Sequence, residues 1–212
     1  MFFYNEQLFA SCYPGSSSEQ TILSPVIDNI PSSVKTLTVK LNFTFQKCMS
    51  FDPKPNPCNE AVELLRREEN KTVGQSELRK KKFDVAATVT AKPKEMSSNP
   101  PVGPGPRSTF SGTVKIRSRV IYLAIKNVAS CLALFTFEVS YGTCPSQGVN
   151  LIKFKKTVAP ESGSTQIEVD GSCVGNAVPT QGSSRLYAIC HSSGEWTAGV
   201  NASCVCTQGY QQ

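Results

Sequence analysis

The cysteines are the residues of this chain with the clearest chemistry. The 212-residue sequence contains nine cysteines and a single histidine, His191. The cysteines are Cys12, Cys48, Cys58, Cys131, Cys144, Cys173, Cys190, Cys204 and Cys206. Their wide, irregular spacing lacks any Cys-x-x-Cys pair and favours disulfide bonds over zinc, which would need four thiolates at workable spacing. Disulfide bonds indicate an oxidising compartment. Because nine is odd, one cysteine cannot pair within the chain.

Catalytic chemistry is not indicated by the sequence. The kinase signatures are a Gly-rich loop with a strand lysine, His-Arg-Asp and Asp-Phe-Gly, and the sequence contains none of them. We expect His191 to be a surface residue. The sequence therefore predicts no enzyme activity for this chain, no cofactor and no metal.

Three Asn-x-Ser/Thr sequons, at Asn42, Asn70 and Asn201, give modest support to secretion and are glycosylation candidates. The apolar start, residues 1–4, is too short for a signal peptide. No run of about 18 apolar residues that could span a membrane is present. A disulfide-bonded chain without a secretion signal is consistent only with an N-terminus that is missing or misassigned.

The basic residues give the chain a formal net charge of +6. The densest basic run is Arg79-Lys80-Lys81-Lys82. Two interpretations stay open: a solvated face of a strand or loop, or a patch for heparin-like sugars or membrane headgroups. Nucleic acid is not expected as a partner in a secreted context.

Strands are the elements that must position these residues. Residues 34–45 alternate for the whole segment, which predicts a half-buried strand. Its apolar face consists of Leu37, Val39, Leu41, Phe43 and Phe45. Further strands are predicted at 83–90, 120–125 and 132–141, and 120–125 is apolar on both faces and therefore central. Strands at this spacing predict an antiparallel sandwich.

Three segments depart from this strand pattern. Residues 59–70 are rich in helix formers, so their composition alone predicts a short helix. Residues 93–107 contain too much Pro and Gly for a strand and predict a long loop, either a binding loop or an idle insertion. At Cys144-Pro145 the composition shifts to Gly and Ser. The segment that follows is small and needs disulfide bonds, so we place a domain boundary near residue 144.

Three blocks of sequence follow one another in the order of a known family. Residues 121–145 combine a Tyr-Leu-Ala strand, a Val-x-x-Cys loop, an apolar strand and a final Cys-Pro. Residues 37–48 form a long alternating strand that ends at Cys48, with Cys58 ten residues later. Residues 168–210 include Trp196 and Cys204-Val-Cys206. Together they resemble the ectodomain of Eph receptors, the ephrin-binding receptor tyrosine kinases.

The resemblance implies an all-β fold in three parts. Residues 1–143 would form an antiparallel, galactose-binding-like jelly-roll sandwich, N-terminally incomplete because it lacks the family's first strands. Residues 144–204 would form a sushi-like module stapled by disulfides, with Trp196 in its core, and residues 205–212 would begin an EGF-like module. The family has a strand at Ala61 to Arg67, so we expect sheet context to override helix propensity there.

The resemblance also implies a disulfide pairing, which sequence alone leaves open among 105 connectivities for eight cysteines. The implied bonds are Cys12–Cys131, Cys48–Cys58, Cys144–Cys190 and Cys173–Cys204. Cys206 would stay unpaired here, because it resembles the first cysteine of the EGF-like module and its partner would lie beyond Gln212.

The family's domain accepts an apolar ephrin loop into a channel between two sheets. Apolar burial supplies affinity there, and rim charges supply selectivity. One wall would consist of Phe45, Gln46 and Lys47 with the Cys48–Cys58 loop. A second wall would consist of Lys115, Ile116, Arg117, Ser118 and Arg119. Family members often carry Arg in place of Gln46, to pair with an ephrin carboxylate, and Lys47 is the candidate substitute.

The implied function is the extracellular ligand-binding region of an ephrin receptor at the plasma membrane. Its partner would be a membrane-anchored ephrin-like protein in contact-dependent cell–cell signalling, with receptor clustering left open. A kinase would belong to the full-length parent protein alone. The alternative is a secreted adhesion or carbohydrate-binding jelly roll with an appended sushi module.

Overall fold

The chain forms two compact units, residues 1–140 and residues 141–212. The computed structural model describes residues 2–4, 9–11, 19–46, 61–90, 107–128, 131–163, 166–182, 185–198 and 203–209. For some residues in strands, including Phe45, Gln46 and Cys131, it describes the backbone only. The division between the units falls close to the predicted boundary near residue 144. None of the helical segments described is long and apolar enough to cross a bilayer.

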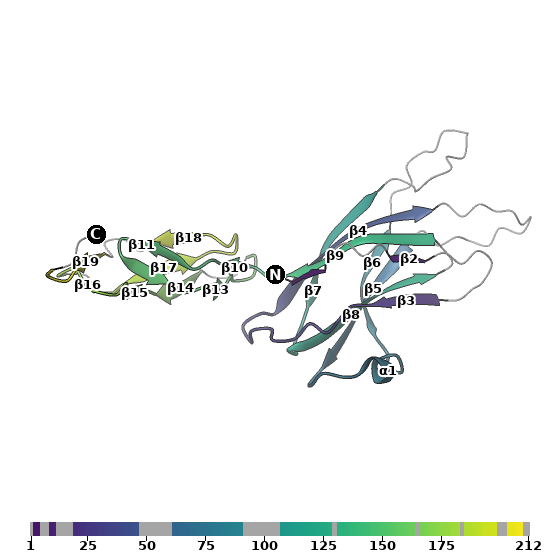
Figure 1. Cartoon of the computed structure of the whole chain (residues 1–212). Helices are drawn as coiled ribbons and strands as arrows, with labels where there is room; N and C mark the ends of the chain where they lie inside the picture. Colours follow the sequence, from purple (N-terminus) through teal and green to yellow (C-terminus); the bar gives the residue numbers. More distant parts are fainter. Residues whose placement is uncertain are drawn as a thin grey trace, which may run out of the picture. The chain divides into compact units, whose positions relative to one another are not determined.

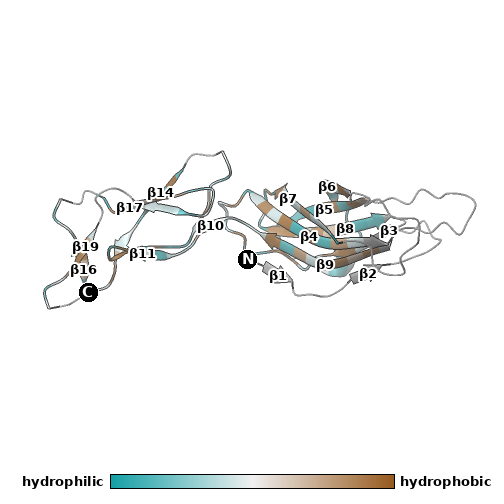
Figure 2. Cartoon of the chain, turned by 90° about the horizontal axis from the view of Figure 1, so that it is seen from above, coloured by the Kyte–Doolittle hydropathy of each residue, from teal (hydrophilic) through white to brown (hydrophobic). Residues whose placement is uncertain are grey.

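The first unit is a sandwich of two antiparallel sheets (Figures 1 and 2). One sheet has the order β1-β9-β4-β7, and β2 also pairs with β9. Its strands are β1 (Phe2–Tyr4), β2 (Phe9–Ser11), β9 (Cys131–Ser140), β4 (Thr36–Gln46) and β7 (Ser108–Lys115). The other has the order β3-β8-β5-β6, with β3 (Glu19–Leu23), β8 (Val120–Val128), β5 (Ala61–Glu69) and β6 (Asp84–Thr90). The prediction of an all-β jelly-roll-like sandwich is confirmed.

The alternation in the sequence explains the core between the sheets. Leu37, Val39, Leu41 and Phe43 of β4 are at most 2% exposed, as their period of two predicts. β8 pairs with β3 on one side and with β5 on the other. It is therefore central, as predicted from its apolar residues on both faces. Apolar burial on this scale is the main stabilising contribution to the sandwich.

The segment with helical composition is strand β5. It pairs antiparallel with β8 and with β6, so both its edges are hydrogen-bonded. Val62 and Leu64 face the sandwich core and are each 1% exposed. Sheet pairing and this burial outweigh the weak helix propensity of the Glu and Arg residues. The prediction of a strand from Ala61 to Arg67 is confirmed.

Between β5 and β6 the chain makes an excursion, residues 70–83, which contains the short helix α1 (Gln75–Leu78). The excursion has a small core of its own, in which Val73, Leu78 and Tyr122 are buried. The Tyr122 hydroxyl accepts a hydrogen bond from the Val73 N–H at 2.8 Å and donates one to the Val73 carbonyl at 3.0 Å. These contacts fix the excursion, hereafter the α1 excursion, against β8.

The second unit consists of short strands in small sheets. β10 (Thr143–Cys144) pairs with β13 (Thr157–Val158), and β16 (Ala177–Pro179) pairs with β19 (Cys204–Cys206). One three-stranded sheet consists of β11 (Gln147–Val149), β12 (Ile152–Phe154) and β15 (Ser172–Cys173). The other consists of β14 (Ile167–Asp170), β17 (Tyr187–Cys190) and β18 (Trp196–Ala198). Among the described residues the unit's hydrophobic cluster is small, with four buried members, Ile152, Phe154, Ala188 and Cys204. Such a core needs covalent support.

Candidate ligand-binding site

The structure separates the two groups of residues that the sequence predicts for one channel. Gln46, at the C-terminal end of β4, lies opposite Cys131 of β9. Thr36, at the other end of β4, lies opposite Lys115 of β7. Ten residues of strand separate these positions, about 33 Å at roughly 3.3 Å per residue. The group around Gln46 and residues 115–119 therefore lie at opposite ends of the sandwich and cannot line a single channel.

This error has a structural cause, because the sequence does not predict strand β7. β7 runs antiparallel to β4 from Phe43↔Ser108 to Thr36↔Lys115 and so carries residue 115 to the far end. Its apolar alternation is interrupted by Gly112. A Cβ atom at Gly112 would lie 2.4 Å from Cζ of Phe110, so the Phe110 ring occupies the space above the glycine. Gly112 therefore weakens the alternation by which a strand is recognised in the sequence, and it also leaves room for the Phe110 ring to pack.

Residues 115–119 form a turn that charged side chains of β5 hold in place. The Glu68 carboxylate accepts hydrogen bonds from the backbone N–H groups of Arg117 and Ser118, at 2.8 and 2.7 Å. The Arg66 guanidinium donates to the carbonyl of residue 115. Ile116 is 4% exposed and belongs to the core, so it is not available to a ligand. The exposed side chains of this turn are Lys115, Arg117 and Arg119.

Beside this turn, Glu69 connects β5 to the α1 excursion. Its Oε1 atom lies 2.9 Å from Lys81 Nζ and 2.8 Å from Arg67 Nε. The hydrogen bond from Lys81, and then that from Arg67, lowers the pKa of Glu69 below its ordinary value. The same contact raises the pKa of Lys81. We call this end of the sandwich, with the turn at 115–119 and the α1 excursion, the α1 end.

The strand ends farthest from the α1 end define the other end of the sandwich, which we call the loop end (Figure 1). In one sheet, the strand registers place the end of β4 beside the starts of β9 and β7. In the other sheet, they place the start of β5 beside the ends of β6 and β8. The chain leaves and re-enters the sandwich here at 11 and 19, at 46 and 61, at 90 and 107, and at 128 and 131. Lys47, Cys48 and Cys58 lie outside the described residues, as do residues 93–106 of the predicted Pro/Gly-rich loop 93–107.

Arg107 is a charged residue at the loop end that the sequence did not single out. Its guanidinium carbon lies 4.3 Å from the centroid of the Phe135 ring. Phe135 is half-buried and stands at the register shift of β9 against β4 between Asn42 and Phe43. A cation over an aromatic face is attracted by the ring quadrupole. No sequence signal could have found this pair, because it depends on the shift in register that presents Phe135.

Beneath the loop end, most of the described residues buried between the sheets are apolar. Phe43, Leu132 and Val62 are each at most 2% exposed. Asn127 of β8 is directly opposite Val62 and is 4% exposed. The two predicted site residues described here, Phe45 and Gln46, end β4 above this layer. The loop end thus combines an apolar interior with a fixed positive charge at Arg107.

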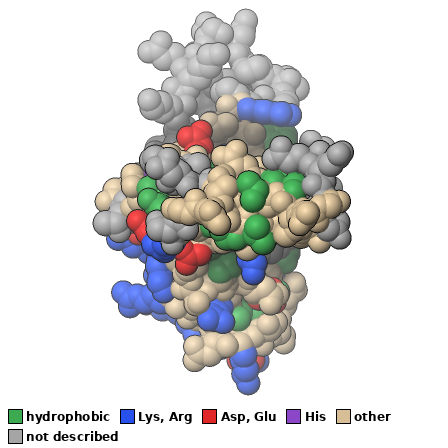
Figure 3. All heavy atoms as spheres, turned by 90° about the vertical axis from the view of Figure 1, so that its left-hand side faces the viewer, with side chains coloured by type: hydrophobic (Ala, Val, Ile, Leu, Met, Phe, Trp, Pro, Cys, Tyr) green, Lys and Arg blue, Asp and Glu red, His purple; other side chains and the backbone are tan. Residues whose placement is uncertain are grey.

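Charge is distributed unevenly along the chain. Residues 1–140 contain 18 Lys and Arg against 12 Asp and Glu, whereas residues 141–212 contain four of each. On the face seen in Figure 3, basic side chains are spread among acidic and neutral ones. The whole net charge of +6 therefore belongs to the first unit.

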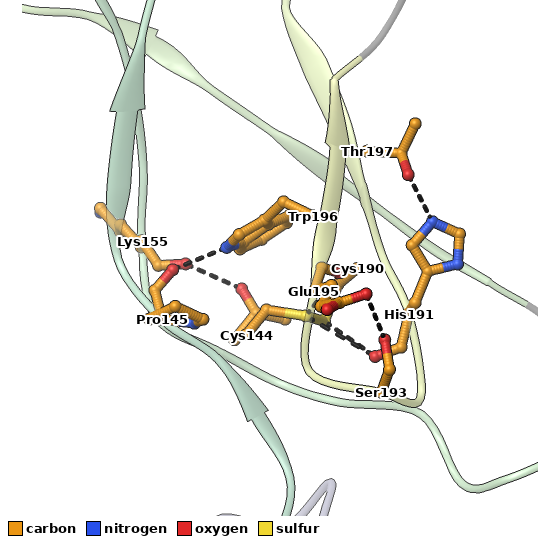
Figure 4. Close-up of a disulfide and its surroundings, with 10 residues drawn as sticks. Cys144, Pro145, Lys155, Cys190, His191, Ser193, Glu195, Trp196 and Thr197 are labelled. Atoms are coloured by element: carbon orange, nitrogen blue, oxygen red, sulfur yellow. Dashed lines mark hydrogen bonds between the residues drawn. A yellow bond between two sulfur atoms is a disulfide. The ribbon is translucent and has the colours of Figure 1, made fainter.

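Two disulfide bonds cross-link the second unit. Cys144 bonds to Cys190 and Cys173 to Cys204, with Cα–Cα distances of 5.9 and 5.8 Å. These are the same partners that the resemblance implied for the four cysteines. Around the first bond, Trp196 Nε1 donates to the carbonyl of Pro145 at 2.6 Å (Figure 4). Bonds of this kind stabilise a small unit by about 2–5 kcal/mol each.

The structure describes some of the remaining cysteines and not others. Within the described residues, Cys206 is the one free thiol. Cys12, Cys48 and Cys58 lie outside these residues, and for Cys131 only the backbone is described. The Cys12–Cys131 and Cys48–Cys58 bonds therefore remain predictions.

The predicted glycosylation sites and His191 differ in their exposure and contacts. Asn70 is exposed in a bend at the start of the α1 excursion, whereas Asn42 lies half-buried within β4, and Asn201 is outside the described residues. His191 Nε2 lies 2.8 Å from Thr197 Oγ1 (Figure 4). Among the residues described, no group of three or more His, Cys, Asp or Glu is arranged to hold a metal ion.

Comparison with known proteins agrees with this division into two units. Residues 5–144 match the family model of the ephrin receptor ligand binding domain. Residues 145–206 match the model of the ephrin cysteine rich domain.

The chain belongs to the ephrin receptor family.

Curated relatives include human ephrin type-A receptor 1, 31% identical over 82% of this chain and 18% of the relative. The mouse type-A receptor 1 is 32% identical over the same shares. Chicken ephrin type-A receptor 7 is 29% identical over 85% of this chain and 18% of the relative. The chain therefore spans about a fifth of the length of these ephrin receptors. Both matched families favour the ephrin receptor interpretation over the adhesion or carbohydrate-binding alternative.

Proposed function

We propose that this chain is the ephrin-binding region of an ephrin receptor and that it binds a membrane-tethered ephrin at the loop end. The observation that carries the proposal is the match of residues 5–144 to the ephrin receptor ligand binding domain. The structure supports the choice of end, because the chain leaves and re-enters both sheets at the loop end. Long connections on a rigid scaffold are common binding elements.

At the loop end, binding would combine apolar insertion with charge. The ligand's apolar loop would extend the layer formed by Phe43, Leu132 and Val62, and burial of apolar surface contributes about 25 cal/mol per Å². Phe45, Gln46 and Lys47 remain our proposed contacts, because β4 ends there. Gln46 supplies no positive charge. Lys47 and Arg107 are the residues we propose to pair with a carboxylate of the ephrin, Arg107 being held over Phe135.

We propose further that the complete protein is a single-pass receptor tyrosine kinase of the plasma membrane, with this chain on its extracellular face. The second unit would be its sushi-like module. Cys206 would begin the next, EGF-like module, with its disulfide partner beyond Gln212. We propose an N-linked glycan at Asn70, where the sequon is exposed.

A pull-down tests the proposal. The completed ectodomain is incubated with the ephrin ectodomains of the same organism, and binding to at least one of them is expected. Failure to bind any of them would exclude the ephrin proposal. Downstream sequence gives a second test, because an EGF-like remainder, fibronectin repeats, a membrane span and a kinase are expected. A stop codon after residue 212 in a complete transcript would favour a secreted adhesion protein.

A further inference from the structure

The α1 excursion presents four basic side chains that ephrin binding at the loop end does not use. Lys71, Arg79, Lys80 and Lys82 are exposed. In the described part of the chain, no ion pair involves any of these four side chains. The fifth basic residue, Lys81, differs because it bonds Glu69 at 2.9 Å and Glu77 at 3.2 Å.

The backbone that carries these side chains is fixed on both sides of the basic run. Leu78, directly before Arg79, is 1% exposed in the core of the excursion. Lys81 is held by Glu69, and the carbonyl of Lys82 accepts a hydrogen bond from Arg67 Nη1 at 3.0 Å. Binding by a fixed group of cations loses less conformational entropy than binding by a mobile tail.

Most of the nearby acidic groups are bonded within the fold, and the exposed carboxylate of Asp84 offsets only one of the positive charges. Glu69 is bonded to Arg67 and Lys81, and Glu68 accepts two backbone N–H groups of the turn at 117–118. Glu77 pairs with Lys81. The exposed Arg117 and Arg119 lie at the same end of the sandwich and add to the positive potential. The α1 end therefore attracts anions, and the attraction weakens with salt.

We propose that the α1 excursion binds a sulfated polysaccharide chain through Arg79, Lys80, Lys82 and Lys71. The disulfide bonds in the second unit indicate an extracellular setting, whereas anionic lipid is concentrated in the cytoplasmic leaflet. A sulfated polysaccharide is a polyanion that suits this extracellular setting. It carries closely spaced sulfate groups, and exposed Lys and Arg side chains can donate charge-assisted hydrogen bonds to the sulfate oxygens.

This surface and the loop end can be occupied together. β5 runs from the loop end at Ala61 to the α1 end at Glu69, about 26 Å at roughly 3.3 Å per residue. The polysaccharide is therefore a further ligand beyond the ephrin, and its binding is independent of whether the ephrin proposal holds.

The test compares the whole chain with two charge-matched variants on immobilised heparin. One variant is R79Q/K80Q/K82Q. The control is K153Q/K155Q/K156Q, which removes three exposed lysines from the second unit. All proteins also carry Asn70→Gln, because a glycan there would stand beside Lys71. Thermal unfolding confirms that the variants remain folded.

We expect the parent chain and the control to bind heparin at about 0.15 M salt. R79Q/K80Q/K82Q is expected to lose at least tenfold in affinity, and the slope of log affinity against log salt is expected to fall by about 3. Equal losses in both variants would overturn the proposal, because binding would then follow net charge alone. Absence of heparin binding, or binding to phosphatidylserine vesicles in preference to heparin, would overturn it too.

Discussion

The loop end and the α1 end of the sandwich differ in what holds them together. At the α1 end, charged side chains of β5 bind backbone groups of the turn at 115–119, and a small core fixes the α1 excursion. At the loop end, the described contacts include the apolar layer beneath the strand ends, Arg107 over Phe135, and the ion pair of Lys126 with Glu63 at 3.9 Å. Mutations that remove buried contacts at the α1 end should change stability, and mutations of the proposed contacts at the loop end should change ephrin binding.

The largest effect is expected from Leu78→Ala. Leu78 is 1% exposed, and its loss leaves a cavity beneath the α1 excursion. Large-to-small changes in buried leucine cost about 2–5 kcal/mol of unfolding free energy. Denaturant unfolding measures the change. Val85→Ala is the control, because Val85 is 56% exposed and should change stability by less than about 0.5 kcal/mol. Equal effects of the two changes would contradict the existence of a separate small core.

Tyr122→Phe is expected to have the next largest effect. The change leaves the N–H and carbonyl of the buried Val73 without their partner hydroxyl. An unsatisfied buried polar group costs about 1–3 kcal/mol. Tyr187→Phe in the second unit is the matched control, because its hydroxyl has no hydrogen bond within the described residues. An unchanged unfolding free energy in Tyr122→Phe would show that the hydroxyl does not anchor the excursion.

Arg107→Ala tests the loop end directly against Arg117→Ala at the α1 end. Loss of the Arg107 charge should weaken ephrin binding by up to about fivefold, since an exposed ion pair with an ephrin carboxylate contributes at most roughly 1 kcal/mol. Arg117→Ala removes an equal charge from the opposite end and should leave ephrin affinity within about twofold. Calorimetric titration of the completed ectodomain with an ephrin measures both. A larger loss of ephrin affinity in Arg117→Ala than in Arg107→Ala would place the ephrin site at the α1 end and contradict our proposal.

The smallest effect is expected from pH. The pKa of Glu69 is lowered below its ordinary value of 4.5, first by Lys81 and then by Arg67. Its ion pairs therefore stabilise the fold above that value, and the contribution is lost as pH falls through the lowered pKa. Unfolding free energy should thus fall more steeply below pH 4.5 in the parent chain than in Glu69→Gln. Parallel curves for the two proteins would show that Glu69 does not contribute.

Much of the fold is predictable from local sequence patterns. The alternation from Leu37 to Phe43 predicts β4 and its buried face, and the apolar run at 120–125 predicts a central strand. Strand β5 needed more than local pattern, because its Arg and Glu residues favour a helix in isolation. The resemblance supplied the sheet context that decides it. The pairing of the second unit's cysteines came from the same source.

The site was less predictable because it depends on register. Strand β7 lacks a strong alternation, since Gly112 stands where the Phe110 ring needs space. A sequence interpretation that omits β7 places residues 115–119 beside the loop end. The pairing of β7 with β4 instead carries these residues to the α1 end. The Arg107–Phe135 contact likewise follows from a register shift that leaves no trace in composition.

Hydrogen–deuterium exchange of the completed ectodomain, with and without a bound ephrin, tests the central claim most directly. It reports protection for backbone amides at both ends of the sandwich in one experiment. We expect ephrin to slow exchange at the loop end, at residues 44–46, 61–63 and 126–128, and to leave residues 66–82 and 115–119 unchanged. Protection confined to 66–82 and 115–119 would contradict the assignment of the ephrin site to the loop end.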